Sequence, residues 1–153
     1  HIDQSLFARN ILDEKNGPPP EVNLFNEKNN GETLLKLIDG NLIKSAHDVS
    51  LGGIITATAK MCIKGNKGIN IKKPKYLINE IEYLFAEDQG RYIVEINKKD
   101  FKKVTDILNK NAVHFDELGI IAENELYIND KTKVTIDELS TSNKSWLINY
   151  MSK

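Results

Sequence analysis

The sequence predicts a layered α+β domain, and three observations lead to this class. The chain has 153 residues, a length typical of one domain that buries most of its unfolded surface. Its composition is that of a folded protein, with 40% hydrophobic and 28% charged residues. Segments with helical and strand periodicity follow one another in the order αβαβ(α)βαβββα. This irregular alternation favours a mixed sheet with helices packed on it.

The first forty residues predict two helices joined by a connector. Ser5 is the expected N-cap of a short helix. Pro18–Pro20 cannot continue a helix and predict an extended, polyproline-like segment. Apolar residues at 24–38 then follow a 3.6-residue pattern, with Asn30–Gly31 as a candidate interruption. Gly40 is expected to cap the C-terminus of this second helix.

The middle of the chain begins with a short strand at 42–48. Residues 51–63 predict a helix whose small residues allow close approach to a sheet. A turn at 65–68 follows, and 69–73 is expected to form an edge strand that ends before Pro74. The next helix, at 76–87, is predicted by the spacing of Leu77, Ile78, Ile81, Leu84 and Phe85.

The last third of the chain predicts four strands and two helical regions. The alternating, β-branched segment 91–97 is a strand, and Asp100 is the expected cap of the helix that follows it. The later elements are two strands at 115–123 and 125–130 around a tight Glu123–Asn124 turn, a strand at 133–136, and one or two helices at 137–151.

Charge and cysteine content exclude several classes of function. The net charge is −1 and the lysines are scattered, most densely at 64–75, so we expect no nucleic-acid partner. No apolar run approaches the roughly 20 residues of a membrane span, so we expect no membrane partner either. Cys62 is the only cysteine, and its apolar neighbours indicate a buried side chain in a reducing, cytoplasmic setting. His1 in place of Met indicates a fragment of a longer chain.

The segment SAHDVSLGG, residues 45–53, carries the strongest candidate for chemistry. It joins a predicted strand to a predicted helix, the place where ligands gather in open α/β sheets. Ser50, Gly52 and Gly53 are expected to present backbone amides to a phosphate group. His47 is a candidate general acid or base, and Asp48 is expected to orient it or to hold Mg²⁺.

A purely structural interpretation of the same residues competes with this one. Asp48 or Ser50 would cap the helix, His47 would bond to nearby backbone, and Gly52 and Gly53 would permit close packing. The full phosphate-loop pattern is absent, so spacing alone favours the structural interpretation.

A second candidate lies at residues 86–96, AEDQGRYIVEI. Glu87 and Asp88 could bind a metal, but an ion pair of Arg91 with one of these acids, beside a bulge at Gly90, is the favoured interpretation. The serine-nucleophile elbow and the paired zinc ligands are both missing from the sequence, and we assign no metal ligand.

Three segments resemble the phosphoribosylformylglycinamidine synthase family, in its small synthetase-subunit form, and the third of them, residues 3–12, is similar to the family's L-G-x-S helix. Residues 17–61 are similar to the family's Pro-rich linker, acidic-asparagine helix and A-H-D-x-S-D-G-G-L corner, and residues 85–92 to its F-G-E-x-Q-G-R-Y segment. The chain departs from the pattern at Leu51, where the family has an acidic residue, and at Asp3, where it has a glycine. The matching residues are Gln4, Ser5, Pro18–Pro20, Asn23, Glu27, Asn30, Gly31, Ala46, His47, Asp48, Ser50, Gly52, Gly53, Phe85, Glu87, Gln89, Gly90, Arg91 and Tyr92.

The resemblance implies both a fold and a reaction. The fold would be the C-terminal domain of aminoimidazole ribonucleotide synthetase relatives, a mixed, mainly antiparallel sheet covered by helices and partly ferredoxin-like. The reaction would be the ATP- and Mg²⁺-dependent conversion of formylglycinamide ribonucleotide and glutamine-derived ammonia to formylglycinamidine ribonucleotide, ADP and phosphate. The chain would then be one domain, 1–153, from the C-terminal part of a multi-domain synthetase, with a linker helix and connector at 1–21 and a core at 22–153.

The resemblance also implies partners and limits. The preceding domains of the same chain, a glutaminase subunit and a small accessory subunit are the expected partners. The fragment alone is expected to fold, to be inactive and to bind no cofactor tightly. Two alternatives remain: a non-catalytic packing module of the same enzyme, or the related domain of aminoimidazole ribonucleotide synthetase, selenophosphate synthetase, thiamine-monophosphate kinase or a hydrogenase-maturation protein.

Overall fold

The computed structural model describes residues 2–15, 17–72, 74, 76 and 79–152. These residues form two compact units. Unit 1 comprises His1–Ala57 and Asn79–Asp116, and unit 2 comprises Thr58–Ile78 and Glu117–Lys153. Several residues named in the sequence analysis lie outside the described residues: His1, Lys73, Lys75, Leu77 and Ile78.

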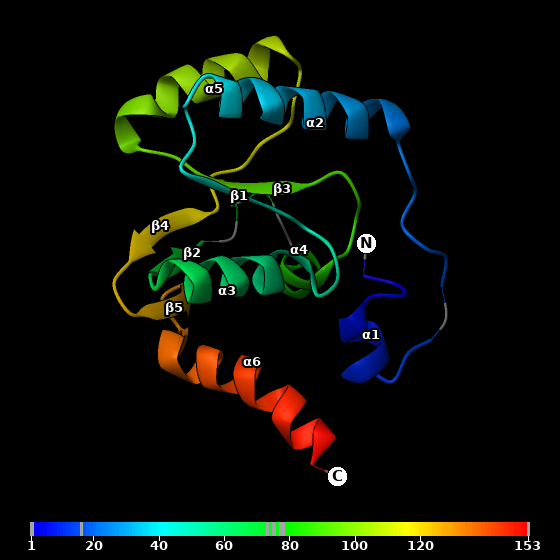
Figure 1. The fold of residues 1–153 in the computed structure, drawn as a ribbon. Coiled ribbons are helices and arrows are strands. Elements are labelled where there is room, and N and C mark those ends of the chain that lie inside the picture. The colour runs from blue at the N-terminus through cyan, green and yellow to red at the C-terminus, as the bar shows by residue number, and fades with distance from the viewer. Residues whose placement is uncertain (1, 16, 73, 75, 77–78, 153) are drawn as a thin grey trace. The chain divides into compact units, whose positions relative to one another are not determined.

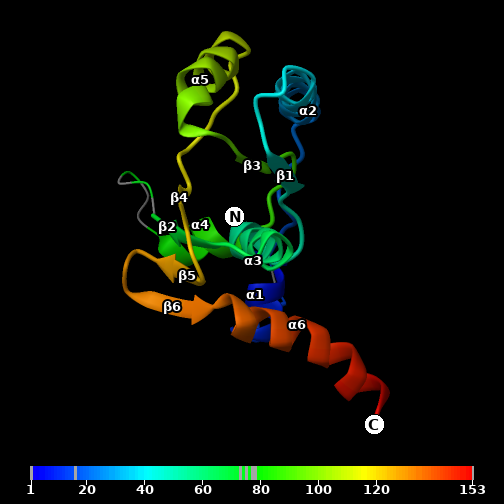
Figure 2. The ribbon, with the colours of Figure 1, turned by 60° about the vertical axis from the view of Figure 1, so that its left-hand side comes forward.

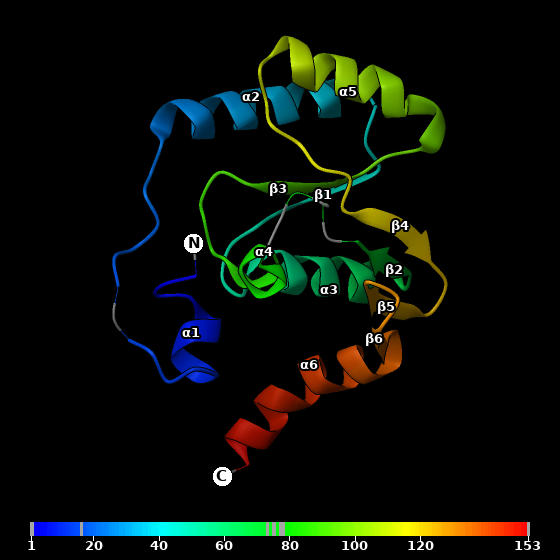
Figure 3. The same ribbon diagram turned by 180° about the vertical axis from the view of Figure 1, so that it is seen from behind.

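Unit 1 is built around a two-stranded antiparallel ribbon with two helices on it. Strand β1 pairs with β3 so that Ser45 lies opposite Glu95 and Asp48 opposite Tyr92. Helices α2 and α5 lie side by side over this ribbon (Figure 1), and β1 lies beside β3 when seen from behind (Figure 3). The elements of unit 1 are α1 (Leu6–Asn10), α2 (Leu24–Asp39), β1 (Ser45–Asp48), the start of α3 (Gly53–Gly65), α4 (Glu80–Phe85), β3 (Tyr92–Glu95), the 3₁₀ turn Lys98–Asp100 and α5 (Phe101–Lys110).

The core of unit 1 lies between α2 and α5. Leu37 and Val104 are each 2% exposed and pack with Leu42. This inner face explains why α2 is continuous through Asn30–Gly31, where an interruption was a sequence expectation. A mid-helix glycine costs only about 1 kcal/mol relative to alanine. Burial of a leucine side chain is worth about 1.5–3 kcal/mol, so the apolar face decides the local structure.

Local signals in unit 1 are confirmed at the helix ends. The Ser5 hydroxyl accepts a hydrogen bond from the Ala8 amide at 3.1 Å, as an N-cap should. Gly40 is the C-cap of α2, as expected. Asp100 precedes α5 but makes no side-chain capping bond there, because a 3₁₀ turn leads into the helix.

Unit 2 contains a four-stranded mixed sheet and the C-terminal helix. Its elements are the rest of α3, β2 (Gly68–Ile71), β4 (Gly119–Ala122), β5 (Glu125–Ile128), β6 (Thr132–Thr135) and α6 (Ile136–Met151). The strand order is β4-β2-β5-β6, with β2 and β5 parallel and the other two pairs antiparallel. Figure 2 shows β5 beside β6 and α6 following directly on β6.

One sequence expectation about this sheet was wrong. Strand β2 is not at an edge, because β4 and β5 flank it on its two sides. The two strands expected around a tight Glu123–Asn124 turn are present as β4 and β5, and their connection crosses the start of β2, which lies between them. The Gly68 amide donates to the Glu123 carbonyl at 2.9 Å. A Cβ atom at Gly68 would collide with the Glu125 backbone, so only glycine permits this crossing.

The expected fold class is confirmed by these sheets, which are mixed and mostly antiparallel and are accompanied by helices. Helix α6 is one helix, and its first turn has a capping box in which Thr135 and Glu138 satisfy each other's backbone amides. In the described part of the chain, none of the helices has the length and apolar content that crossing a bilayer requires.

Candidate functional site

The candidate site is the corner between β1 and α3, residues 45–53. Strand β1 ends at Asp48 and α3 begins at Gly53. The Val49 amide donates to the Arg91 carbonyl at 2.9 Å, which extends the β1–β3 pairing by one residue. Val49 is 6% exposed, whereas Ser50 and Leu51 are exposed at the tip of the turn. The corner is therefore anchored on its β1 side and open at its tip.

Both glycines of the corner adopt backbone angles that favour glycine. Gly52 has φ +83° and Gly53 has φ +69°. An added Cβ at Gly53 would lie 2.6 Å from the Leu84 carbonyl oxygen and 2.8 Å from that of Ala86. At Gly52 it would collide with the Thr56 side chain. The close packing that the structural interpretation assigned to these glycines is present.

The amides of the corner differ in their partners. The Gly52 amide donates to Glu87 Oε1 at 2.8 Å, and the Gly53 amide donates to the Ser50 carbonyl at 3.0 Å. The Ser50 and Leu51 amides donate to no protein acceptor within the described ranges of the chain. The phosphate-binding role of Ser50, Gly52 and Gly53 stays a prediction. Its geometry favours the tip of the turn over the two buried glycines.

His47 and Asp48 lie next to each other at the end of β1. His47 Nδ1 lies 2.6 Å from the Asp48 carbonyl oxygen, and since a carbonyl only accepts, Nδ1 carries the hydrogen. The same nitrogen is 3.4 Å from Asp48 Oδ1. In the neutral form of the ring, Nε2 then carries the free lone pair that a general base requires. The His47 side chain is only 26% exposed, while that of Asp48 is 66% exposed.

Glu87 connects the corner to the start of α1. Its Oε1 accepts from the Gly52 amide and from the Leu6 amide, each at 2.8 Å. Glu87 belongs to the other candidate segment of the sequence, and its link to a residue 35 positions away was not predicted. The signal that could have found it is the second resembling segment, in which Glu87 is a matching residue.

The remainder of that second candidate is structural, as the favoured interpretation expected. Arg91 Nη2 lies 3.7 Å from Asp88 Oδ2, and Arg91 Nε donates to the Asp88 carbonyl at 3.1 Å. Burial lowers the pKa of Arg91 from its ordinary value, and the nearby Asp88 carboxylate opposes that change. Gly90 has φ +67°, and its carbonyl accepts from Asn30 Nδ2 at 3.0 Å.

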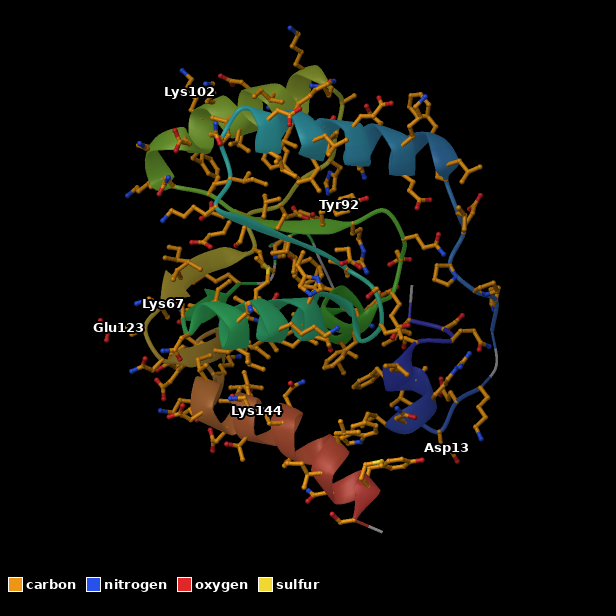
Figure 4. All side chains as sticks on the ribbon, in the orientation of Figure 1. Asp13, Lys67, Tyr92, Lys102, Glu123 and Lys144 are labelled. Atoms are coloured by element: carbon orange, nitrogen blue, oxygen red, sulfur yellow. The ribbon has the colours of Figure 1, made fainter. Side chains whose placement is uncertain are left out.

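Tyr92 adds a second link to α2. It extends from β3 (Figure 4), and its hydroxyl lies 3.6 Å from the position a Cβ would take at Gly31. The Asn30–Gly90 bond and this short distance place the resembling residues of α2 close to those of the segment before β3.

Cys62 lies in the core, and the described residues form no metal-binding cluster. Cys62 is 5% exposed, and burial raises the pKa of its thiol to about 11, so it is an unreactive core residue. Within the described ranges, no three His, Cys, Asp or Glu side chains gather closely enough to hold a metal ion.

Each unit has a hollow on its surface. Lys102, on the outer side of α5, borders the first, and Glu123, which projects from the β4–β5 connection, borders the second (Figure 4). The first is lined by Lys99, Lys102, Lys103, Asp106, Ile107 and Lys110. The second is lined mainly by polar residues of unit 2, among them Asn66, Glu123, Asn124, Glu125, Tyr127 and Asp137.

Comparison with known proteins shows which family the chain matches. Residues 4–131 match the family described as "AIR synthase related protein, C-terminal domain". The chain is 70% identical over 151 residues to phosphoribosylformylglycinamidine synthase subunit PurL of Pelagibacter ubique, covering 99% of the chain and 21% of that protein. It is 36% identical over 153 residues to PurL of Bartonella henselae, covering all of the chain and again 21% of the relative. The chain thus spans about one fifth of the length of these curated relatives.

Solved structures of Thermotoga maritima PurL share the fold. The structure complexed with FGAR has a TM-score of 0.69 at 22% identity, over 78% of the chain and 21% of that protein. The structure complexed with ATP has a TM-score of 0.64 at 22% identity, over 74% of the chain and 21% of that protein. A structure of PurLQS has a TM-score of 0.68 at 23% identity, over 87% of the chain and 24% of that protein. The resemblance inferred from the three sequence segments is confirmed.

Proposed function

Since the chain belongs to the family of AIR synthase related C-terminal domains, we propose that it is the C-terminal domain of a phosphoribosylformylglycinamidine synthase of purine biosynthesis. The observation that carries this proposal is the 70% identity over 151 residues with PurL of Pelagibacter ubique. The identity extends across nearly the whole chain, well beyond the short motifs that a shared superfamily alone would explain.

The proposed activity belongs to the whole enzyme. ATP would transfer a phosphoryl group to the glycinamide carbonyl oxygen of formylglycinamide ribonucleotide, releasing ADP, and ammonia would then displace phosphate from that carbon to give formylglycinamidine ribonucleotide. Such a reaction depends chiefly on positioning and on stabilisation of developing negative charge. The Thermotoga maritima structures complexed with FGAR and with ATP support these two ligands for the family fold. The PurLQS structure supports accessory subunits as partners.

Within that enzyme, the 45–53 corner is the part of this chain proposed to face the ligand. The Ser50 and Leu51 amides lie just before the N-terminus of the 13-residue helix α3, where the helix dipole favours an anion. His47 would present Nε2 as a proton acceptor, with Nδ1 held by the Asp48 carbonyl. Within the described residues no three His, Cys, Asp or Glu side chains gather as a metal site, and the role of Asp48 in holding Mg²⁺ stays a prediction.

A chimaera tests the proposal. The 151 aligned residues of Pelagibacter ubique PurL are replaced by this chain, and ADP release is measured with formylglycinamide ribonucleotide, ammonia and ATP. We expect substrate-dependent turnover within about tenfold of the parent enzyme. The matched control is the same replacement with the aligned segment of Bartonella henselae PurL. A folded chimaera without substrate-dependent turnover, beside an active control, would overturn the assignment.

One observation favours the packing-module alternative: both corner glycines are buried, and their amides have partners inside the chain. The His47→Ala and Asp48→Asn variants of the full-length protein separate the two roles. Lost activity at an unchanged melting temperature supports a ligand-facing corner. A lowered melting temperature with activity retained in the folded fraction supports a packing role.

A further inference from the structure

We propose that Glu87 is the positioning residue of the corner: its carboxylate fixes the turn before α3 and ties it to the start of α1. The inference rests on the proposed function of the corner. It goes further by assigning a positioning role to a residue outside the 45–53 corner, and by stating which amides are left for a ligand.

Two hydrogen bonds are accepted by one oxygen atom of Glu87. Glu87 Oε1 accepts from the Gly52 amide and from the Leu6 amide, both at 2.8 Å. A carboxylate that accepts amide hydrogens forms charge-assisted bonds, which are stronger than neutral ones. Gly52 is buried, so water cannot readily replace the lost acceptor. Removing the carboxylate therefore leaves a buried donor without a partner.

The carboxylate is itself held in place by its neighbours. Ala86, the preceding residue, is 2% exposed, and Leu84 is 4% exposed. The ring of Phe85 lies against that of Phe7, with centroids 4.5 Å apart. The segment that carries Glu87 is thus packed on both its α4 side and its α1 side. This preorganisation lets a single side chain define where the turn lies.

The bond to Gly52 also sets the direction of the amides before it. The plane of the Leu51–Gly52 peptide is defined by the Gly52 N–H bond to Glu87, and the neighbouring peptides carry the Ser50 and Leu51 amides. Since Glu87 already holds the Gly52 amide, an anionic group of a ligand would meet the Ser50 and Leu51 amides instead. Loss of Glu87 should therefore weaken ligand binding without any direct contact between Glu87 and the ligand.

The test uses the full-length synthase that carries this chain, with Glu87→Ala and Glu87→Gln. Glu21→Gln, which changes an exposed carboxylate in the connector, is the matched control. We expect Glu87→Ala to lower kcat/KM about tenfold to a hundredfold, mainly through a raised KM for the phosphate-bearing substrates. Glu87→Gln keeps an acceptor oxygen without the charge and should lose less, so it acts as a partial rescue. Melting temperatures are measured alongside, and assays are run well below them.

Hydrogen exchange of the same variants supplies a second readout. In Glu87→Ala, peptides that contain Leu6 and Gly52 should exchange faster, while those of β2 and β5 in unit 2 should be unchanged. The proposal is overturned if kcat/KM of folded Glu87→Ala stays within twofold of the parent, or if exchange rises equally throughout the chain. An unaltered enzyme without synthase activity would instead refute the proposed function, so the two failures are distinguishable.

Discussion

Replacing Gly53 by alanine is expected to destabilise unit 1 strongly. The residue has φ +69°, a conformation that costs an alanine about 1–2 kcal/mol. Its new Cβ would lie 2.6 Å from the Leu84 carbonyl oxygen and 2.7 Å from the Phe85 carbonyl carbon. Both are backbone atoms at the end of α4, which cannot turn aside as a flexible side chain would. Overpacking of this kind costs about 1–3 kcal/mol.

The two effects together predict a loss of about 2–5 kcal/mol in the free energy of unfolding. For a chain of this length, 1 kcal/mol corresponds to a fall in melting temperature of about 2–4 °C. A fall on the order of 10 °C is therefore expected. Urea unfolding and thermal melting, both followed by far-ultraviolet circular dichroism, measure the change.

Gly65→Ala is the matched control, because it alters the same helix at its other end. No atom lies within 4 Å of the position its Cβ would take. Alanine is the better helix former, so the stability of this variant should be unchanged or raised by up to about 1 kcal/mol. If Gly53→Ala were as stable as the parent protein, within about 0.5 kcal/mol, the close approach of α3 and α4 would be wrong.

Two further predictions concern titrating groups. Burial raises the pKa of the Cys62 thiol from 9.0 to about 11, so stability should fall as the pH rises through that window, where the unfolded thiol ionises first. A thiol-reactive chromophore should label Cys62 far more slowly in the native protein than in denaturant, and equal rates would contradict its burial. Hydrogen bonds from Thr135 lower the pKa of Glu138, so the capping box should stabilise α6 above the ordinary carboxyl range and be lost as the pH falls through the lowered value. Trp146 fluorescence during acid titration, compared between the parent and Thr135→Ala, measures this, and identical acid transitions would exclude the capping contribution.

Local signals predicted much of the fold. The Ser5 cap, the Gly40 cap and the strand 92–95 are determined by residues near in sequence, and each is present. The strands that pair in the sheet of unit 2 are not determined by residues near in sequence. The position of β2 between β4 and β5 depends on the crossing at Gly68, where a glycine permits close backbone approach, and no pattern within the strand itself encodes that partner.

The candidate site was likewise predicted only in part. The His47–Gly53 corner was found from its residue types and its resemblance to a family pattern, and its strand-to-helix setting is confirmed. The partner of the Gly52 amide was not predicted, because Glu87 is brought to it by the packing of α4 and α1. A carboxylate far away in the sequence can satisfy an amide that a motif alone would assign to a ligand.

Hydrogen exchange of the full-length synthase, with and without saturating formylglycinamide ribonucleotide and a non-hydrolysable ATP analogue, measures whether the tip of the 45–53 corner meets a ligand. We expect the Ser50 and Leu51 amides to exchange rapidly in the free enzyme and to slow markedly when ligand binds. Unchanged exchange at these two amides, while other segments of the enzyme become protected, would contradict a ligand-facing corner.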